Sequence, residues 1–243
     1  MKSYVISLKR NTERRLHICK EFERANIHFD FFDAIEPNHN EILIKENNFT
    51  CEIGMSDLEL SCFFSHIEIY KNMIQKDIKI AAIFEDDVHI GHDVQHIFNN
   101  ITSIPIGIDI LKLEMFNKRV RVSKKTKFNH HSLYKLKSRH LGAAGYIITL
   151  SAAKKVLRIL SKSLLLKPID KVIFEDLILN KDIQCYQIYP AVCIQDYKLY
   201  KNNGSFKSDL DNGRVLDEKV KISFLQKIKR EAKRLTYLRL KFR

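Results

Sequence analysis

Three consecutive acids, Glu85, Asp86 and Asp87, are the residues whose types and spacing best suit chemistry. They follow a mostly apolar run at residues 78–84 that is typical of a buried strand. Because ligands of open α/β sheets bind beyond the carboxyl ends of the strands, this cluster would lie where a ligand binds. Mg²⁺ and Mn²⁺ prefer carboxylate oxygens and often bridge them to substrate phosphates. The acids therefore predict a divalent metal site; the alternative is a solvated turn that merely ends the strand.

Hydrophobic periodicity predicts the elements that must position these acids. Residues 4–8 form a short apolar strand, residues 12–22 have a helical pattern, and residues 27–33 form a second strand. This strand–helix–strand opening predicts a parallel α/β unit. A long helical pattern at residues 58–75 leads into the strand before the acids.

The second half of the chain continues this alternation, so we expect an α/β fold with a mostly parallel central sheet flanked by helices. Two segments are expected to lack regular structure: the polar residues 36–60, and the basic residues 118–127, which should be solvated and mobile. Strands are expected at residues 108–113, 146–150 and 184–189, with helices at residues 151–160, capped by Ser151, and after Pro168.

The composition is that of a soluble globular protein, with 45% hydrophobic and 29% charged residues among 243. A chain of this length can bury a substantial core within one domain. The formal net charge is +13, and residues 219–243 hold ten Lys or Arg residues against one acid, Glu231. We therefore divide the chain into a main α/β domain at residues 1–215 and a basic tail at residues 216–243, to which we assign the basicity.

The basic tail has an amphipathic pattern. From Lys219 onward, apolar residues recur near one helical face, and Lys and Arg fill most other positions. Such a helix can lie on an anionic membrane surface, which we favour. A partner-docking helix is the second alternative and nucleic-acid binding the third, since a basic tail is attracted to any polyanion. The apolar positions are Ile222, Leu225, Ile228, Ala232, Leu235, Leu238 and Phe242.

The five cysteines and the N-terminus indicate the compartment. An odd number of cysteines without a C-x-x-C spacing predicts neither a zinc site nor a disulfide framework, so we expect mostly buried thiols in a reducing compartment. The first residues run straight into a strand without a signal peptide, and no apolar run approaches the roughly 18 residues of a membrane span. We therefore expect a cytoplasmic protein.

Several short motifs occur in order along residues 3–196. Residues 61–66 read Ser-Cys-Phe-Phe-Ser-His, and residues 84–88 read Phe-Glu-Asp-Asp-Val. The others are Val-Ile-Ser-Leu at residues 5–8 with Arg14 and Arg15, Phe-Asp-Ala-Ile at residues 32–35, Gly-Tyr-Ile-Ile at residues 145–148 with Ala-Ala-Lys at residues 152–154, and Pro-Ile-Asp at residues 168–170. Together these motifs resemble glycosyltransferase family 25, the lipooligosaccharide and collagen-type sugar transferases. Residues 61–66 resemble the family's Gly-Cys-x-x-Ser-His motif, with Ser where Gly is usual, and residues 84–88 resemble its acidic metal motif.

The resemblance implies a GT-A type nucleotide-sugar-binding fold, a UDP-activated sugar, a divalent metal (Mn²⁺ or Mg²⁺) and inversion at the anomeric carbon. On the bacterial side of the family the sugar is commonly galactose and the acceptor is lipooligosaccharide. The small size and the lack of a secretory signal favour that side. The expected enzyme works at the inner face of a bacterial inner membrane, as a peripheral protein.

The resemblance also implies which residues bind the donor. The first strand should border the uracil and ribose, and arginines near the first helix can meet phosphates, which a guanidinium matches bidentately. His66 is either a phosphate or ribose contact or a satisfied core histidine, and the turn at residues 142–145 either approaches the sugar or is an ordinary turn. The expected donor-binding residues are Val5, Ile6, Ser7, Leu8, Arg10, Arg14, His66, Glu85, Asp86 and Gly145.

The metal ligands are expected within the acidic motif. Asp87 should bind the ion directly, with Asp86 or Glu85 as a second ligand and the remaining acid on the ribose. Gln195, at the end of the last strand, can complete the metal shell, and Asp196 competes for that role.

An inverting transfer also needs a base that removes the proton of the attacking hydroxyl, and a carboxylate is the usual choice. Asp170, at a helix start after Pro168, is the first candidate, with Glu175 and Asp176 in reserve. An Asp at that position is also a common structural cap, because the helix dipole stabilises its ionised form.

The leading hypothesis is therefore an inverting, metal-dependent transferase that moves galactose from UDP-galactose to lipooligosaccharide. Two alternatives remain open at this point. One is a metal-dependent phosphohydrolase or nuclease that uses the same acids. The other is a non-enzymatic protein that binds polyanions through its tail.

Overall fold

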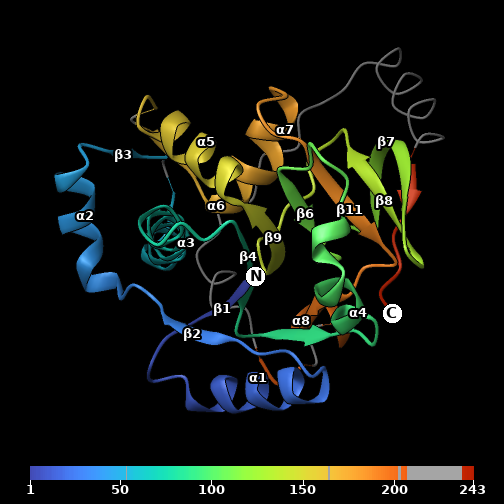
Figure 1. The fold of residues 1–243 in the computed structure, drawn as a ribbon. Helices are drawn as coiled ribbons and strands as arrows, with labels where there is room; N and C mark the ends of the chain where they lie inside the picture. Colours follow the sequence, from blue (N-terminus) through green and yellow to red (C-terminus); the bar gives the residue numbers. More distant parts are fainter. Residues whose placement is uncertain (53, 164, 202–203, 207–236) are drawn as a thin grey trace, which may run out of the picture.

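Nine strands of the described residues form one large sheet (Figure 1). The computed structural model describes residues 1–52, 54–163, 165–201, 204–206 and 237–243. The strands are β1 (Lys2–Ser7), β2 (Asp30–Asp33), β4 (Ile80–Glu85), β6 (Ile110–Lys112), β7 (Arg119–Phe128), β8 (His131–Leu136), β9 (Gly145–Thr149), β11 (Cys185–Tyr189) and β13 (Tyr237–Arg239). Their order across the sheet is β13–β7–β8–β11–β6–β9–β4–β1–β2.

The sheet is mixed. β1 pairs in parallel with β2 and β4, and β11 pairs in parallel with β6. β9 lies antiparallel between β4 and β6, and β8, β7 and β13 continue antiparallel from β11. Six of the nine described strands thus run in one direction, as the predicted α/β fold requires. This common direction agrees with the expected mostly parallel sheet, while the antiparallel pairs could not be predicted, because an apolar run does not reveal the direction of its strand.

Helices pack on both faces of this sheet (Figure 1). The helices are α1 (Thr12–Arg24), α2 (Asn40–Glu46), α3 (Asp57–Gln75), α4 (Val94–Asn99), α5 (Leu150–Leu160), α6 (Ile169–Lys171), the π-helical turn η3 (Val172–Asp176), α7 (Leu177–Leu179) and α8 (Asp196–Leu199). One core cluster packs α3, α5 and α6 against one face, and a second packs α1 and α4 against the other. Along β4, Ala81 and Ile83 enter the first cluster and Ala82 and Phe84 the second, since successive strand residues point to opposite faces.

Short elements complete the fold. They are η1 (Pro37–His39), β3 (Thr50–Cys51) paired with β10 (Leu165–Leu166), β5 (Val88–Ile90) paired with β12 (Cys193–Gln195), and η2 (Ile101–Ser103). The prediction of an irregular excursion at residues 36–60 is therefore wrong, because this segment contains η1, α2, β3 and the start of α3.

Side-chain caps fix the starts of the two longest helices on the α3 side. Ser56 Oγ accepts from Glu59 N at 3.2 Å, and Glu59 Oε2 accepts from Ser56 N at 3.0 Å, which is a capping box. At α5 the cap is Thr149, whose Oγ1 accepts from Ala152 N at 3.1 Å. The expected cap, Ser151, lies inside the helix, because the chain turns out of β9 two residues earlier than predicted.

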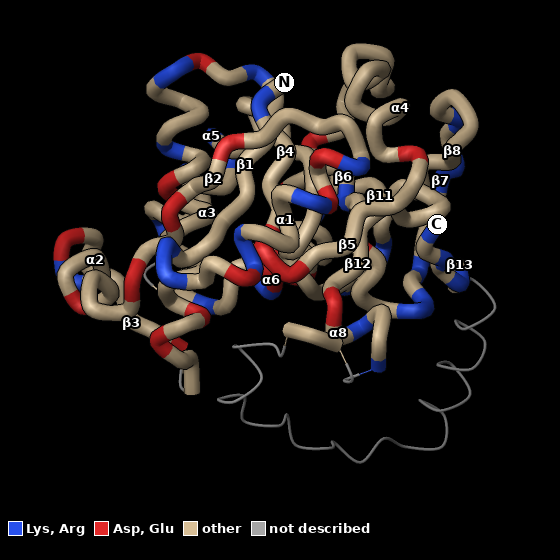
Figure 2. The backbone as a smooth tube through the Cα atoms, turned by 90° about the horizontal axis from the view of Figure 1, so that it is seen from below, with Lys and Arg blue, Asp and Glu red and all other residues tan. Residues whose placement is uncertain are grey.

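The basic residues 118–127 are mostly a strand, which corrects the prediction of a solvated, mobile segment. They belong largely to β7, which pairs antiparallel with β8. No Asp or Glu occurs between Glu114 and Asp170, whereas fourteen Lys and Arg residues do. Figure 2 shows blue residues along β7, β8 and β13. Positive charge is therefore not confined to the tail as expected; acids elsewhere in the chain balance this region in the net charge.

The predicted tail helix lies mainly outside the described residues, as does the predicted domain boundary at residues 215 and 216. The described end of the tail is extended. β13 pairs with β7, and Phe242 forms a bridge with Ala191. The helical assignment of Leu238 and Phe242 is thus wrong, because their backbone follows the sheet. None of the helices described is both long and apolar enough to cross a membrane.

All five cysteines are free thiols, as the lack of a disulfide framework predicted. Cys185 and Cys193 are buried, Cys51 and Cys62 are half-buried, and Cys19 is exposed. The expectation of mostly buried thiols is therefore wrong for Cys19, which lies on the outer surface of α1.

Candidate active site

The acidic motif lies where β4 ends and the chain turns into β5. Asp86, which is 6% exposed, is held by the first strand and the first helix. Its Oδ2 accepts from Ser7 Oγ at 2.6 Å and its Oδ1 accepts from Arg14 Nη1 at 2.9 Å. Asp86 therefore ties the motif to β1 and α1, and its orientation is fixed by two donors.

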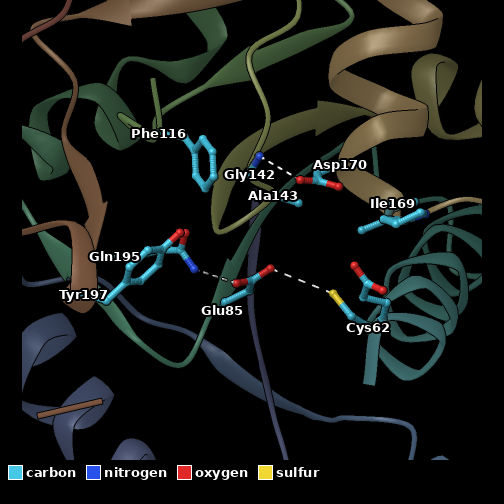
Figure 3. Close-up of a pocket in the computed structure, with 11 residues that line it drawn as sticks. Cys62, Glu85, Phe116, Gly142, Ala143, Ile169, Asp170, Gln195 and Tyr197 are labelled. Atoms are coloured by element: carbon cyan, nitrogen blue, oxygen red, sulfur yellow. Dashed lines mark hydrogen bonds between the residues drawn. The ribbon is translucent and has the colours of Figure 1, made fainter. Parts of the chain in front are cut away.

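The other two acids of the motif, Glu85 and Asp87, converge on Gln195, and Figure 3 shows Glu85 beside this amide. Gln195 Nε2 donates to Glu85 Oε2 at 3.2 Å and lies 3.3 Å from Asp87 Oδ2. This contact forms because β12, which ends at Gln195, pairs antiparallel with β5, placing Gln195 opposite Val88. Residues 110 positions apart in sequence thus meet at one edge of the sheet.

The electrostatics of the motif favour a cation. Burial raises the pKa of the Glu85 carboxyl well above its ordinary value, and the charges of Asp87 and Glu114 raise it further. Burial raises the pKa of Asp87 to about 7, although the Arg14 guanidinium acts in the opposite direction. When both are ionised, the carboxylates of Glu85 and Asp87 repel each other across one neutral amide, and a divalent cation between them would relieve this repulsion. The residues present therefore fit such an ion, since rotating the Gln195 amide would offer it a third oxygen.

Two adjoining hollows meet at this motif. The first, which we call the cleft, lies between the end of β1, α1 and α3, and Ser7, Arg14 and Asp86 line it. The second, which we call the pocket, lies between α3, the turn at residues 142–143 and the start of α6 (Figure 3). Both hollows are lined by Cys62, Glu85 and Gln195. A substrate with two parts could therefore occupy both hollows and pass directly beside Glu85.

Asp170 lines the pocket across from Glu85 (Figure 3). Its Oδ2 accepts from Gly142 N at 3.1 Å and its Oδ1 accepts from Lys171 N at 2.8 Å. Two backbone N–H groups thus orient the carboxylate, which is 8% exposed. Pro168 precedes the helical segment that begins at Ile169, so the local sequence places this acid in the first helical turn, as predicted.

A buried ion pair supports the turn that holds Asp170. Lys112 Nζ lies 3.2 Å from Glu114 Oε2 and donates to the carbonyls of Leu141 and Gly142. Glu114 Oε2 also accepts from Ala144 N at 3.2 Å. A Cβ on Gly142 would lie 2.6 Å from Glu114 Oε1, so glycine is needed for this close approach. This pair was not among the residues expected at the site, although a Lys and a Glu two residues apart in an apolar strand indicate charges on one buried face.

The structure brings only part of the predicted donor-binding set to the cleft. Ile6, Ser7, Leu8 and Arg14 line it together with Glu85 and Asp86. Val5 is fully buried in the core, because it points to the opposite face from its neighbours. Arg10 pairs with Glu36 on the surface, and neither hollow includes it.

Three further predicted residues lie away from both hollows. Gly145 begins β9, and a Cβ there would lie 2.5 Å from Cys193 Sγ, so its role is close packing. Glu175 lies 3.7 Å from Arg139 Nη1, and Asp176 pairs with Lys167 at 2.9 Å. These two reserve acids therefore sit with surface cations, because η3 turns them away from the pocket.

His66 is a core histidine, as one of its two predicted roles has it, but only its Nδ1 and not its Nε2 has a hydrogen-bond partner among the described residues. It is fully buried, and its Nδ1 lies 2.7 Å from Tyr146 Oη, which also bonds the hydroxyl of Tyr70. Burial lowers the pKa of His66 to about 3, so the ring is neutral. The network joins α3 to β9 behind the pocket.

Tyr146→Phe is expected to destabilise the protein, by about 1–3 kcal/mol, because His66 and Tyr70 then lose their shared buried partner. Urea unfolding of the variant and the wild type measures this. Ligand affinity at the cleft should stay unchanged, since Tyr146 does not line it. An unchanged unfolding midpoint would contradict the role of this network.

Asp196, the competitor of Gln195, points away from the acidic motif. Its Oδ1 lies 2.8 Å from His89 Nε2, and its Oδ2 accepts from Phe206 N at 2.9 Å. Only its backbone meets the motif, through Asp196 N and the carbonyl of Asp87 at 2.8 Å. Residues 195 and 196 thus point to opposite sides, as neighbours at a strand end do.

Several residues that line the pocket were not expected there. Glu59, Cys62, Phe116 and Tyr197 line the pocket. Burial raises the pKa of the Cys62 thiol well above its ordinary value, and the nearby Glu85 raises it further, so the thiol is protonated. A signal was available only for Cys62, which lies within the motif at residues 61–66.

The whole chain is similar to known bacterial proteins. A "Putative glycosyltransferase" of Haemophilus influenzae is 35% identical over 235 residues, which cover 94% of this chain and 83% of that protein. "Lipooligosaccharide biosynthesis protein lex-1" of the same organism is 30% identical, with 98% and 89% covered. "Lacto-N-neotetraose biosynthesis glycosyltransferase LgtE" of Neisseria meningitidis is 31% identical, with 88% and 82% covered.

The family described as "Glycosyltransferase family 25 (LPS biosynthesis protein)" matches residues 1–173. The matched segment contains the cleft-lining end of β1, the acidic motif and Asp170, which are most of the site described above. With a match over more than two thirds of its length and relatives at 30–35% identity, the chain belongs to glycosyltransferase family 25.

Proposed function

We propose that this chain is an inverting transferase with a GT-A type arrangement that moves galactose from UDP-galactose to a lipooligosaccharide acceptor. The observation that carries the proposal is that Asp170 and Glu85, the first acid of the acidic motif, face each other across one pocket. The printed names of two relatives, which refer to lipooligosaccharide and lacto-N-neotetraose biosynthesis, support the acceptor. Membership of a glycosyltransferase family disfavours the phosphohydrolase, nuclease and polyanion-binding alternatives.

In this proposal the cleft holds the UDP part of the donor. The end of β1 borders the uracil and ribose, and Arg14 lies at the cleft wall with its guanidinium near the acids. Because Ser7 and Arg14 fix Asp86, this carboxylate is oriented to accept a hydrogen bond from a ribose hydroxyl. The sugar then extends past Glu85 into the pocket.

Glu85, Asp87 and Gln195 are the residues that would hold Mn²⁺ or Mg²⁺, because their oxygen-rich, buried side chains converge on one point. When bound, the ion neutralises the charge that develops on the diphosphate leaving group. The protein's own contribution is to keep these side chains preoriented through the pairing of β5 and β12.

Asp170 is the proposed base. It accepts the proton of the acceptor hydroxyl as that oxygen forms a bond to the anomeric carbon and the bond to the diphosphate breaks. Its place across the pocket from Glu85 supports attack from the side opposite the leaving group, which gives inversion. The N–H groups of Gly142 and Lys171 hold the carboxylate in one orientation beside the pocket.

An enzyme with a lipid-linked acceptor has to act at a membrane surface. We propose that this chain associates peripherally with the inner face of the bacterial inner membrane. The basic residues of segment 219–243 would supply attraction to anionic lipids.

A thermal-shift panel tests the donor. UDP-galactose, UDP-glucose, UDP-N-acetylhexosamines and UDP are each added with and without Mn²⁺. A ligand that binds only the folded state stabilises it by about 2.7 kcal/mol at one hundred times its Kd, so a rise in Tm that needs Mn²⁺ and is largest with UDP-galactose is expected. No shift with any nucleotide sugar would overturn the proposed function, and a larger shift with another sugar would reassign the donor.

A further inference from the structure

His17, Glu21 and His89 form a second cluster of side chains that can bind a metal. His17 and Glu21 lie one turn apart on α1, and His89 is the middle residue of β5. One ligand atom from each of the three lies within 4.8 Å of the others. None of them lines the cleft or the pocket, and all three are half-buried, so an ion from solvent can reach them.

Each of these side chains is already oriented by an outer partner. His17 Nε2 lies 2.9 Å from the carbonyl oxygen of Val88, which can only accept, so this nitrogen carries the proton and Nδ1 has the lone pair. His89 Nε2 lies 2.8 Å from Asp196 Oδ1, which leaves Nδ1 on the inner side, 3.8 Å from Glu21 Oε1.

Glu21 is held in the same way through its other oxygen. Glu21 Oε2 accepts from Ile90 N at 2.8 Å and from Arg24 Nη2 at 2.8 Å. Its Oε1 therefore remains for an ion. One carboxylate and two imidazoles, each fixed by a second contact, reproduce the carboxylate–histidine and carbonyl–histidine pairs that surround protein metal sites.

We propose that His17, Glu21 and His89 bind a divalent transition-metal ion such as Zn²⁺ or Co²⁺, at a site separate from the acidic motif. Two imidazole nitrogens and one carboxylate oxygen suit these borderline ions, with water in the remaining position. The acidic motif offers oxygens alone and suits Mg²⁺ or Mn²⁺. The two sites therefore differ in the class of ion they select.

An ion here would link the segments that carry the active-site residues. It would join α1, which carries Arg14, to β5, which directly follows Asp87. Through His89 it would also fix Asp196, the neighbour of Gln195. The ion is therefore a structural one that stabilises the framework of the site without touching the substrate.

Co²⁺ binding to the untagged full chain tests the proposal. Excess Mg²⁺ keeps the acidic motif occupied, and visible absorption of Co²⁺ reports nitrogen ligands at low coordination number. Wild type should bind one Co²⁺ with visible absorption, and Zn²⁺ should displace it. His17→Ala and the near-isosteric Glu21→Gln should each weaken Co²⁺ affinity at least about tenfold, as the loss of a metal-site residue does.

Two further variants separate this site from others. His28→Ala removes an exposed histidine near the end of the α1 segment and should leave Co²⁺ binding unchanged. Asp87→Asn should keep the absorption, because the acidic motif is not involved. Unfolding in EDTA verifies that each variant folds. Equal Co²⁺ affinity in wild type, His17→Ala and Glu21→Gln, or no binding by wild type, would overturn the proposal and leave His89 as a link between Glu21 and Asp196.

Discussion

Asp87→Asn is expected to abolish Mn²⁺-dependent binding of the donor and to slow sugar transfer at least about a hundredfold. A rate loss of this size is typical when an active site loses one preorganised electrostatic contact to the reacting groups. The proposed ion would lose one of its two carboxylate ligands, those of Glu85 and Asp87, while the Asn side chain keeps the shape of Asp. Titration calorimetry of the UDP-sugar with and without Mn²⁺, together with a transfer assay, measures both effects.

The same variant should be more stable than wild type when no metal is present. The folded-state pKa of Asp87 is raised from its ordinary value near 3.8 to about 7 by burial. A carboxyl with a raised pKa costs stability as the pH rises from about 4 towards 7, because the folded state then has to hold the buried charge. Asn cannot ionise, so in EDTA its Tm should exceed that of wild type at pH 8 and approach it near pH 4. Unchanged donor affinity with Mn²⁺ would refute the metal role of Asp87.

Asp170→Asn is expected to lower the transfer rate by roughly a hundredfold to ten-thousandfold, the range over which a general base contributes. The donor should still bind with nearly unchanged affinity, because its UDP part lies in the cleft, which Asp170 does not line. Single-turnover transfer measures the rate, and titration calorimetry measures the donor affinity. Asn keeps one oxygen for the N–H of Gly142 or Lys171, so the fold should survive.

The neighbouring acid Asp176 provides the matched control. It has the same side chain six residues further on but pairs with Lys167 outside the pocket. Asp176→Asn should therefore transfer sugar at nearly the wild-type rate. If Asp170→Asn stayed fully active and Asp176→Asn did not, the assignment of the base would be reversed.

The positions of Glu85, Asp170 and Arg14 could be predicted from the sequence, because each depends on residues close to it in the chain. An apolar strand that ends in Glu85 places its acids at a sheet edge, and Pro168 places Asp170 at a helix start. The helical spacing of α1 likewise puts Arg14 on the side that faces the strand.

The contacts between distant residues could not be read in this way. Gln195 was proposed, but its meeting with Glu85 depends on the pairing of β5 and β12, two three-residue strands too short to give a pattern. One partner of Asp86 is a serine hydroxyl from β1, a strand that was expected only to border the uracil and ribose. The antiparallel position of β9 decided that Gly145 packs on Cys193 instead of reaching the sugar, and strand direction leaves no mark in periodicity.

The late position of Gln195 in the chain has a consequence for biosynthesis. During translation Glu85 and Asp87 emerge more than one hundred residues before Gln195, whose amide contacts both carboxylates in the folded protein. A partly synthesised chain could pair β1, β2, β4 and β9, yet its carboxylates would still face one another without that partner. The nascent domain is therefore expected to mature in two stages, and only a chain that has emerged beyond β12 can acquire its substrate.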